Sequence, residues 1–113
     1  GSNAVGSLLD APKGGVTRFV TGADGKIADL GPTLDRIKNG VKFPHRNDGT
    51  IFKNREGLLP SKPAGYWTEH VHPTPGGKGP GLQRIVIGQN GEIYFTPDHY
   101  KTFIPLNPNG GAW

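Results

Sequence analysis

Three ionisable side chains in the C-terminal half of the chain could act together on one phosphodiester. Glu69 and Arg84 each lie in a short apolar segment, and His99 lies in the run 96–103 near the end of the chain. We expect Glu69 to act as a base, Arg84 to stabilise charge on the phosphoryl oxygens, and His99 to act as an acid. The reaction that needs these three groups and no metal is RNA transesterification, in which the ribose 2′-OH attacks the adjacent phosphorus. DNA lacks that hydroxyl, so the mechanism predicts that DNA is not a substrate.

A second group of residues, 52–57, has the composition of a base-recognition loop. Gly57 permits backbone dihedral angles that other residues avoid, and Glu56 supplies a carboxylate beside the backbone N–H groups. Guanine complements this pattern, because its N1–H and 2-amino group donate to a carboxylate while O6 and N7 accept from amides. Two alternatives stay open from the residues alone. The loop can be a charged surface turn, and Glu69 and Arg84 can form a cross-strand ion pair.

The histidines and cysteines bear on metal binding. His70 and His72 would lie on one face of a strand, but two imidazoles without a third ligand at fixed spacing are a weak indication of a metal site. The chain has no cysteine, which excludes disulfides, thiolate metal sites and a cysteine nucleophile. We therefore expect no metal and no other cofactor, with a metal-dependent nuclease as an alternative.

Positive charge is concentrated in the middle of the chain. The net charge is +4, and between Arg36 and Lys62 seven Lys or Arg residues accompany two acidic ones, giving +5 there and −1 elsewhere. A concentrated basic region suits a polyanion such as nucleic acid, although a surface selected for solubility has the same composition. No apolar run approaches the roughly 18 residues that a membrane-spanning helix needs, so we expect no membrane partner.

Composition and pattern predict an α+β fold. Of the 113 residues, 33% are hydrophobic and 30 are Gly or Pro, which indicates one loop-rich domain. A short helix is predicted to begin at Pro32 and to end at Asn39, with Leu34 and Ile37 on its apolar face. Five short strands are predicted at residues 50–52, 66–72, 82–88, 92–96 and 99–104. Short strands joined by tight turns favour an antiparallel sheet against which the helix packs.

Alternation along the strands assigns faces. Trp67, Glu69 and Val71 are expected on one face of their strand, with Thr68 and His70 on the other. In the next strand, Arg84 and Val86 share a face, which leaves Ile85 and Ile87 for the core. An open face shared by Glu69 and Arg84 is favourable, because a buried charge is costly unless it is paired.

The chain is expected to divide into three parts. Residues 1–31 are predicted to be a Gly-rich linker or appended hairpin, with a turn at Asp24-Gly25 and with residues 1–4 as a tag-removal scar. Residues 32–107 are predicted to form the catalytic domain, and residues 108–113 a C-terminal tail. The absence of methionine suggests a piece of a longer polypeptide or a processed form.

Six segments, in this order, resemble the microbial guanyl-preferring ribonucleases, the family that includes barnase and ribonuclease Sa. The segments are residues 52–56, 59–60, 66–69, 74–76, 81–85 and 98–103, within a match from about Leu34 to Ile104. The resemblance implies a helix packed on a twisted antiparallel sheet, with the active site on the exposed sheet face. It also implies that single-stranded RNA is cleaved 3′ of guanosine to a 2′,3′-cyclic phosphate, which water then opens to the 3′-phosphate.

The resemblance assigns roles to individual residues. It implies Glu69 as general base, His99 as general acid and Arg84 on the phosphate. It implies substrate binding by Phe52, Lys53, Asn54, Arg55, Glu56 and Tyr100, with Tyr100 beside His99.

Two features depart from the family pattern. Pro80 stands where the family usually has a second arginine, four residues before Arg84, and proline cannot bind phosphate. We expect either that Lys78 reaches the substrate instead or that transition-state stabilisation is weaker, because a lysine replaces a bidentate arginine only in part. The ribonuclease Sa disulfide is absent, as in barnase.

The resemblance extends to biological context. A basic ribonuclease with a Gly-rich leader resembles the toxin domain at the end of a large bacterial delivery protein. We expect a monomer that is secreted or delivered from a bacterium and acts in the target-cell cytoplasm. An acidic immunity or inhibitor protein is expected to cover its active site. The alternatives are an ordinary secreted ribonuclease and a catalytically weak RNA-binding module.

Overall fold

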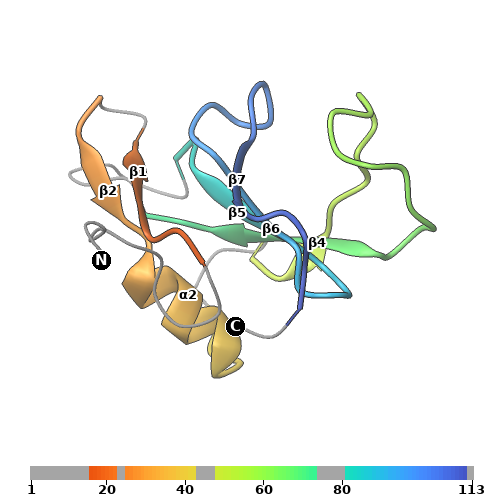
Figure 1. Cartoon of the computed structure of the whole chain (residues 1–113), viewed down its shortest axis with the longest axis horizontal. Helices are drawn as coiled ribbons and strands as arrows, with labels where there is room; N and C mark the ends of the chain where they lie inside the picture. Colours follow the sequence, from red (N-terminus) through yellow and green to blue (C-terminus); the bar gives the residue numbers. More distant parts are fainter. Residues whose placement is uncertain (1–15, 23–24, 43–47, 74–80, 112–113) are drawn as a thin grey trace.

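The computed structural model describes residues 16–22, 25–42, 48–73 and 81–111. These residues form one helix and two antiparallel sheets (Figure 1). The smaller sheet pairs β1 (Phe19–Thr21) with β2 (Ile27–Asp29). The larger sheet has the order β3-β4-β5-β6-β7, formed by β3 (Thr50–Ile51), β4 (Trp67–Val71), β5 (Arg84–Gly88), β6 (Ile93–Thr96) and β7 (Ile104–Asn107).

The helix α2 (Gly31–Lys38) lies where the sequence predicts it. Its first turn contains Pro32, and the Asp29 carboxylate accepts a hydrogen bond from the Gly31 N–H at 2.9 Å. Basic residues in the last turn interact favourably with the negative end of the helix dipole, and Gly40, with φ of 72°, adopts the left-handed conformation that commonly ends a helix. Eight residues make a marginal helix in water, so α2 depends on packing against the sheet.

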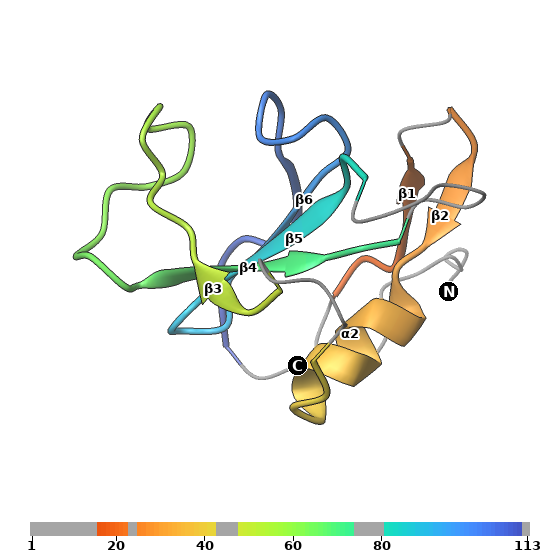
Figure 2. The ribbon, with the colours of Figure 1, turned by 180° about the vertical axis from the view of Figure 1, so that it is seen from behind.

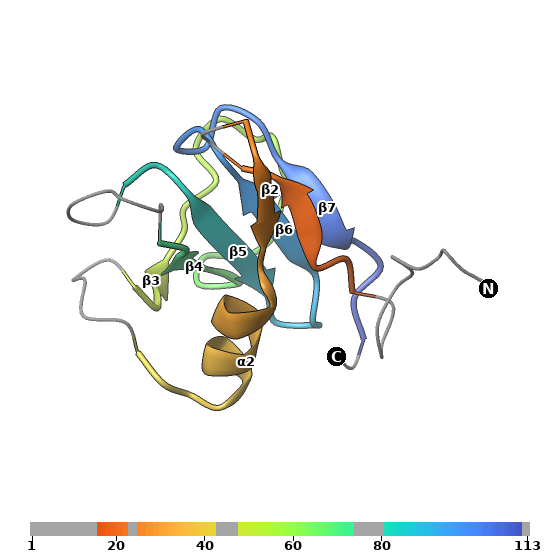
Figure 3. The ribbon, with the colours of Figure 1, turned by 90° about the vertical axis from the view of Figure 1, so that its left-hand side faces the viewer.

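The main hydrophobic core lies between one face of the large sheet and a layer formed by α2 and the β1–β2 hairpin. Figure 3 shows the hairpin and the helix in front of the sheet, on the same side. The buried apolar residues of this core come from all of these elements: Val16, Val20, Leu30, Leu34, Ile85, Ile93, Phe95 and Leu106. The predicted hairpin is therefore packed into the main core.

A buried ion pair connects the helix to the sheet. The Arg36 guanidinium lies 3.1 Å from the Asp48 carboxylate and donates to the Val71 carbonyl at 2.7 Å, while Asp48 accepts from the Val71 N–H at 2.9 Å. Arg36 belongs to the basic region of the sequence, but its side chain binds Asp48 and Val71 inside the protein.

Strands β4, β5 and β6 agree with the predicted ones, and their side chains alternate between the faces as predicted. The expectation that Arg84 lies on an open face is wrong, because only 2% of its surface is exposed. Glu69 pairs with Val86 and Val86 with Tyr94 on the face away from the helix, whereas Ile85 and Phe95 enter the core. The prediction of a fifth strand at residues 99–104 is wrong. The last strand is β7, and a loop occupies residues 97–103.

Two loops extend from the sheet on the side opposite to α2. Figure 2 shows the loop between β3 and β4 and the loop between β6 and β7 above the sheet, with the helix below it. These loops carry most of the residues to which the sequence assigns chemistry. No helix in the described part of the chain is long and apolar enough to span a membrane.

Candidate active site

Glu69 lies at the centre of the sheet face that the two loops border. Its strand is flanked by β3 and β5, where Thr50 and Val86 are its register partners. The Tyr100 hydroxyl donates a hydrogen bond of 2.6 Å to the Glu69 Oε1 atom. Because Tyr100 belongs to the loop between β6 and β7, this bond connects that loop to the central carboxylate.

A pocket of about 270 Å³ opens above Glu69. Its walls are the loop after β3 on one side and Tyr100 on the other. The lining residues are Ile51, Phe52, Lys53, Asn54, Arg55, Glu56, Glu69 and Tyr100. The structure therefore brings the expected base and the expected substrate-binding loop into one cavity. In the sequence, 12 residues separate Glu56 in the loop from Glu69 in β4.

Asn54 and Gly57 shape the loop. Both have positive φ, 54° for Asn54 and 67° for Gly57, and the Gly57 N–H donates to the Asn54 carbonyl at 3.0 Å. The Asn54 side chain donates to the Leu59 carbonyl at 2.9 Å and accepts from the Leu59 N–H at 3.1 Å. Asn54 thus braces the loop from within, while the side chains of Arg55 and Glu56 stay exposed beside the pocket.

Arg84 is buried next to Tyr100. Only 2% of its surface is exposed, and its Nη1 atom donates to the carbonyls of Gly81 and Gln83, each at 2.9 Å. Burial raises the pKa of Tyr100, and the hydrogen bond to Glu69 and the charge of Glu69 raise it further, while Arg84 opposes the rise. Tyr100 is therefore a neutral hydrogen-bond donor at physiological pH, positioned between a carboxylate and a guanidinium.

His99 is presented by a strained turn. His99 and Tyr100 have positive φ, 56° and 75°, which residues with side chains seldom adopt. The His99 N–H donates to the Leu82 carbonyl and the Tyr100 N–H to the Thr96 hydroxyl, both at 2.9 Å. The His99 ring is exposed, with its centroid 4.7 Å from that of Tyr100. His99 does not line the pocket itself and lies at its Tyr100 side.

Asp98 holds this turn, a role that the sequence analysis did not assign. Its carboxylate accepts from the Thr96 and Thr102 hydroxyls, at 3.0 and 2.7 Å, and from the N–H groups of Lys101 and Thr102, at 3.2 and 2.9 Å. Partial burial raises the pKa of Asp98, but these hydrogen bonds outweigh it and hold the pKa below its usual value. The signal available in the sequence was an aspartate followed four residues later by threonine, which favours a turn over a strand.

Phe103 is a second residue that the sequence analysis missed. Its ring centroid lies 5.8 Å from that of Phe52, which in turn stacks on Tyr100 at 4.9 Å. The three rings join the two loops across the pocket wall. The sequence alone does not show that an aromatic residue at the end of a loop, such as Phe103, packs against a second loop.

The remaining sequence-based expectations divide into two groups. Lys78 and Pro80 lie outside the described residues. His70 and His72 are described, and their ring nitrogens lie 3.1 Å from the Thr68 hydroxyl and 2.8 Å from the Thr33 hydroxyl. Within the described ranges, no group of three or more His, Cys, Asp or Glu side chains is arranged to hold a metal ion.

Comparison with known proteins covers most of the chain. The model of a family described as ribonuclease matches residues 27–107. Guanyl-specific ribonuclease St of Saccharopolyspora erythraea is 43% identical over 82 residues, which are 69% of this chain and 81% of that protein. Guanyl-specific ribonuclease Sa3 of Kitasatospora aureofaciens is 49% identical over 72 residues, 63% of this chain and 51% of Sa3, so the match spans about half of that relative.

A solved structure shares the fold. The crystal structure of ribonuclease Sa2 with guanosine-2′-cyclophosphate superposes with a TM-score of 0.64 at 42% sequence identity, covering 70% of this chain and 85% of that one. The α+β architecture expected from the sequence, a short helix on an antiparallel sheet, is confirmed by this similarity and by the strand order.

Proposed function

We propose that this chain, which belongs to the ribonuclease family, cleaves single-stranded RNA on the 3′ side of guanosine through a 2′,3′-cyclic phosphate. The observation that carries the proposal is the shared pocket, in which the Glu69 carboxylate and the loop 52–56 face one cavity. Support also comes from relatives that are guanyl-specific ribonucleases and from the ribonuclease Sa2 complex with a guanosine cyclophosphate.

Glu69 is proposed to start the reaction. Its carboxylate takes the proton of the ribose 2′-OH, and the 2′-oxygen forms a bond to phosphorus as the bond from phosphorus to the 5′-oxygen breaks. The hydrogen bond from Tyr100 fixes the orientation of the carboxylate, because one of its oxygens is held at 2.6 Å. The other oxygen is proposed to take the proton of the substrate hydroxyl.

Arg84 and His99 are proposed to complete the transfer. Arg84 is fixed by two backbone carbonyls, so its positive charge is in place before negative charge develops on the phosphoryl oxygens. His99 donates a proton to the departing 5′-oxygen and afterwards accepts one from the water that opens the cyclic phosphate. Its exposure at the Tyr100 side of the pocket suits a group that reaches the leaving nucleotide.

The loop after β3 is proposed to recognise guanine. Glu56 accepts hydrogen bonds from the guanine N1–H and 2-amino group, while backbone N–H groups of the loop donate to O6. The aromatic pair Phe52 and Tyr100 supplies a surface for stacking at the pocket wall. The exposed side chains of Lys53 and Arg55 add positive charge beside it.

The test is an RNA oligonucleotide with a single guanosine, together with its 2′-deoxyguanosine analogue, each with and without a chelator. We expect cleavage of the ribose substrate alone, in both conditions, with a cyclic phosphate as the first product. Glu69→Ala and His99→Ala should each lower kcat by about a hundredfold or more. Glu56→Ala should spare cleavage but reduce the preference for guanosine over adenosine.

Each contrary outcome points to a different mechanism. Full activity of Glu69→Ala, or cleavage of the deoxy analogue, contradicts the 2′-OH mechanism. Loss of activity with chelator favours a metal-dependent nuclease. Binding of the oligonucleotide without turnover favours an RNA-binding module.

We further propose that the chain acts as a bacterial toxin delivered into target cells as a monomer, and that an acidic inhibitor covers the pocket. Positive charge at the pocket from Lys53 and Arg55 supports such a partner, since opposite charge accelerates association. Expression of the active chain in a bacterial cytoplasm should arrest growth, whereas Glu69→Ala should not. Growth at the normal rate with active enzyme present contradicts the toxin role.

A further inference from the structure

A second cavity, of about 400 Å³, lies beside the pocket proposed for guanine. The two share one wall, formed by Ile51, Phe52, Lys53 and Asn54. The other wall of the second cavity is formed by residues 61–65 and by Trp67, two positions along β4 from Glu69. Neither Glu69 nor Tyr100 lines it, so none of the proposed catalytic groups needs this space.

The lining combines flat apolar surface with positive charge. Ile51 is 56% exposed although it belongs to a strand, and Pro63 and Ala64 add small apolar surfaces. Two exposed cations, Lys53 and Lys62, border the cavity. A planar, weakly polar ring joined to an anion matches this combination, which is the chemistry of a nucleotide.

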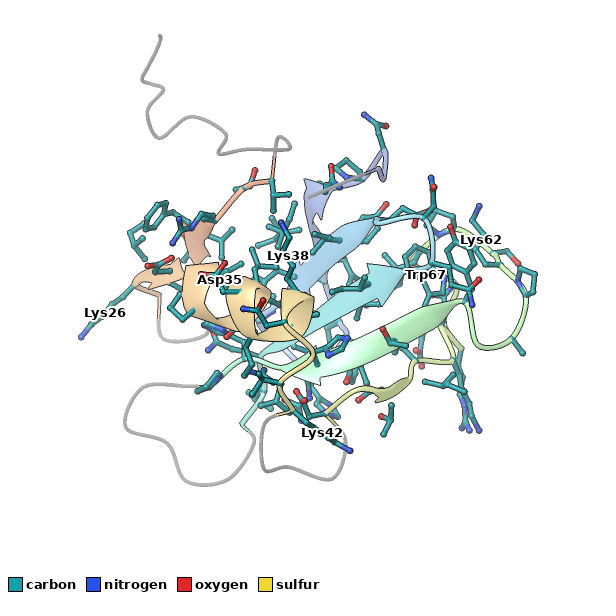
Figure 4. All side chains as sticks on the ribbon, turned by 90° about the horizontal axis from the view of Figure 1, so that it is seen from below. Lys26, Asp35, Lys38, Lys42, Lys62 and Trp67 are labelled. Carbon is teal, nitrogen blue, oxygen red and sulfur yellow. The ribbon has the colours of Figure 1, made fainter. Side chains whose placement is uncertain are left out.

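Lys62 is held at the edge of the cavity. Its Nζ atom lies 5.1 Å from the centroid of the Tyr66 ring. Figure 4 shows Lys62 beside Trp67 at one end of the molecule, whereas Lys26 lies at the opposite end. The ammonium group of Lys62 therefore lies near the cavity, whereas Lys26 lies at the opposite end of the molecule.

Hydrogen bonds fix the wall of the second cavity that residues 61–65 and Trp67 form. The Tyr66 N–H donates to the Pro63 carbonyl at 3.1 Å, the Trp67 indole donates to the Pro60 carbonyl at 3.3 Å, and Gln89 donates to the Gly65 carbonyl at 3.3 Å. A wall held in this way is preformed, so a ligand does not have to order it on binding.

We propose that this cavity binds the nucleotide on the 5′ side of the guanosine in an RNA substrate, with its base against Ile51 and its phosphate near Lys53 and Lys62. The assignment rests on the proposed function. The scissile phosphate is on the 3′ side of guanosine and must lie near Glu69 and His99, so the 3′ strand leaves on the Tyr100 side. The 5′ phosphate then leaves over the shared wall, toward the second cavity.

The test compares kcat/KM for three substrates: GpU, UpGpU with a 5′ extension, and GpUpU with a 3′ extension. In the wild type, the 5′ extension should raise kcat/KM about tenfold, the usual scale for stacking one base. Lys62→Ala should lose most of this gain, and Ala64→Phe, which fills the cavity, should lose it as well. Both variants should cleave GpU at the wild-type rate, because GpU does not reach the cavity.

Lys26→Ala is the charge-matched control at the opposite end of the molecule, and it should keep the full gain. The dependence of log kcat/KM on log salt for UpGpU should become shallower by about one in Lys62→Ala but not in Lys26→Ala. An equal 5′ gain in the wild type, Lys62→Ala and Ala64→Phe overturns the proposal. So does a Lys62-dependent gain from the 3′ extension. Failure of the wild type to cleave GpU would instead count against the proposed function.

Discussion

The hydrogen bond between Tyr100 and Glu69 joins two functions in one contact. Glu69 must remain a carboxylate that accepts the substrate proton, and a neutral phenol at 2.6 Å orients it without adding charge. The raised pKa of Tyr100 keeps the phenol protonated. Tyr100 is therefore proposed as a positioning residue for Glu69 as well as a surface for the substrate.

Tyr100→Phe should lower kcat/KM for GpU by about tenfold or more, because a hydrogen bond to a charged group contributes about 1.5–3 kcal/mol. The ring of Phe keeps the stacking on Phe52, so KM should change less than kcat. Tyr66→Phe is the matched control, since the Tyr66 hydroxyl makes a hydrogen bond of the same length, 2.6 Å, to Glu92, and neither of these residues lines the pocket. An unchanged kcat in Tyr100→Phe would show that Glu69 does not depend on this bond.

Sequence was sufficient to name most of these residues but not their contacts. Glu69 and the loop 52–56 stand in segments whose order is distinctive, so they could be found by resemblance. The bond from Tyr100 to Glu69 and the packing of Phe103 on Phe52 connect positions 31 and 51 residues apart. Such contacts arise from the folding of the sheet, and no local pattern encodes them.

The turn between β6 and β7 is the element that positions His99, the proposed general acid. The Asp98 carboxylate satisfies two backbone N–H groups and two hydroxyls within residues 96–102. These bonds stabilise a backbone in which His99 and Tyr100 have positive φ, an arrangement that costs about 1–3 kcal/mol per residue. The strain is compatible with function, because this backbone places Tyr100 in the lining of the pocket and His99 next to Tyr100.

Asp98→Ala should release this turn. We expect a loss of about 2–4 kcal/mol in the free energy of unfolding, since several donors lose their shared acceptor, together with a drop in kcat. Asp35→Ala removes an exposed carboxylate from α2, and its free energy of unfolding should stay within about 0.5 kcal/mol of the wild type. Chemical denaturation and GpU cleavage measure both quantities. Wild-type stability in Asp98→Ala would contradict the role of the carboxylate in holding the turn.

The same turn explains the wrong strand prediction. Residues 99–104 are rich in aromatic and β-branched side chains, which favours a strand. The side chain of Asp98 offers the following N–H groups an alternative partner, so pairing with β6 begins only at Ile104. By contrast, β5 was predicted correctly because its apolar run is buried, with Ile85 and Val86 fully inaccessible to solvent.

At the scale of the whole molecule, the N-terminal hairpin contributes to the core that supports the site. Val20 and Leu30 pack with Phe95 in the main core. Phe95 belongs to β6, which ends at Thr96, where the turn that presents His99 begins. Sequence indicated the hairpin from its turn residues, but it gave no sign of this packing, because β1 has a single buried residue, Val20, and β2 has none among its three residues. The boundary expected at residue 31 stays a prediction.

The stability of the whole molecule should depend on pH through two histidines, the buried His72 and the half-buried His70. Burial lowers the pKa of His70 and of His72. Arg36 lowers both further, while Asp48 opposes the shift at His70 and Asp29 opposes it at His72. In the unfolded chain both histidines titrate near 6.5. As the pH falls below that value, the unfolded state binds more protons than the folded state, so the stability of the protein falls with the pH.

The melting temperature should therefore decrease between pH 7.5 and 5, with a smaller decrease in the double variant His70→Gln, His72→Gln. Carboxylates with lowered pKa, such as Asp98, lose their contribution only at lower pH, so this window isolates the histidines. Equal slopes in the wild type and the double variant would contradict this assignment, even if the variant is less stable at every pH.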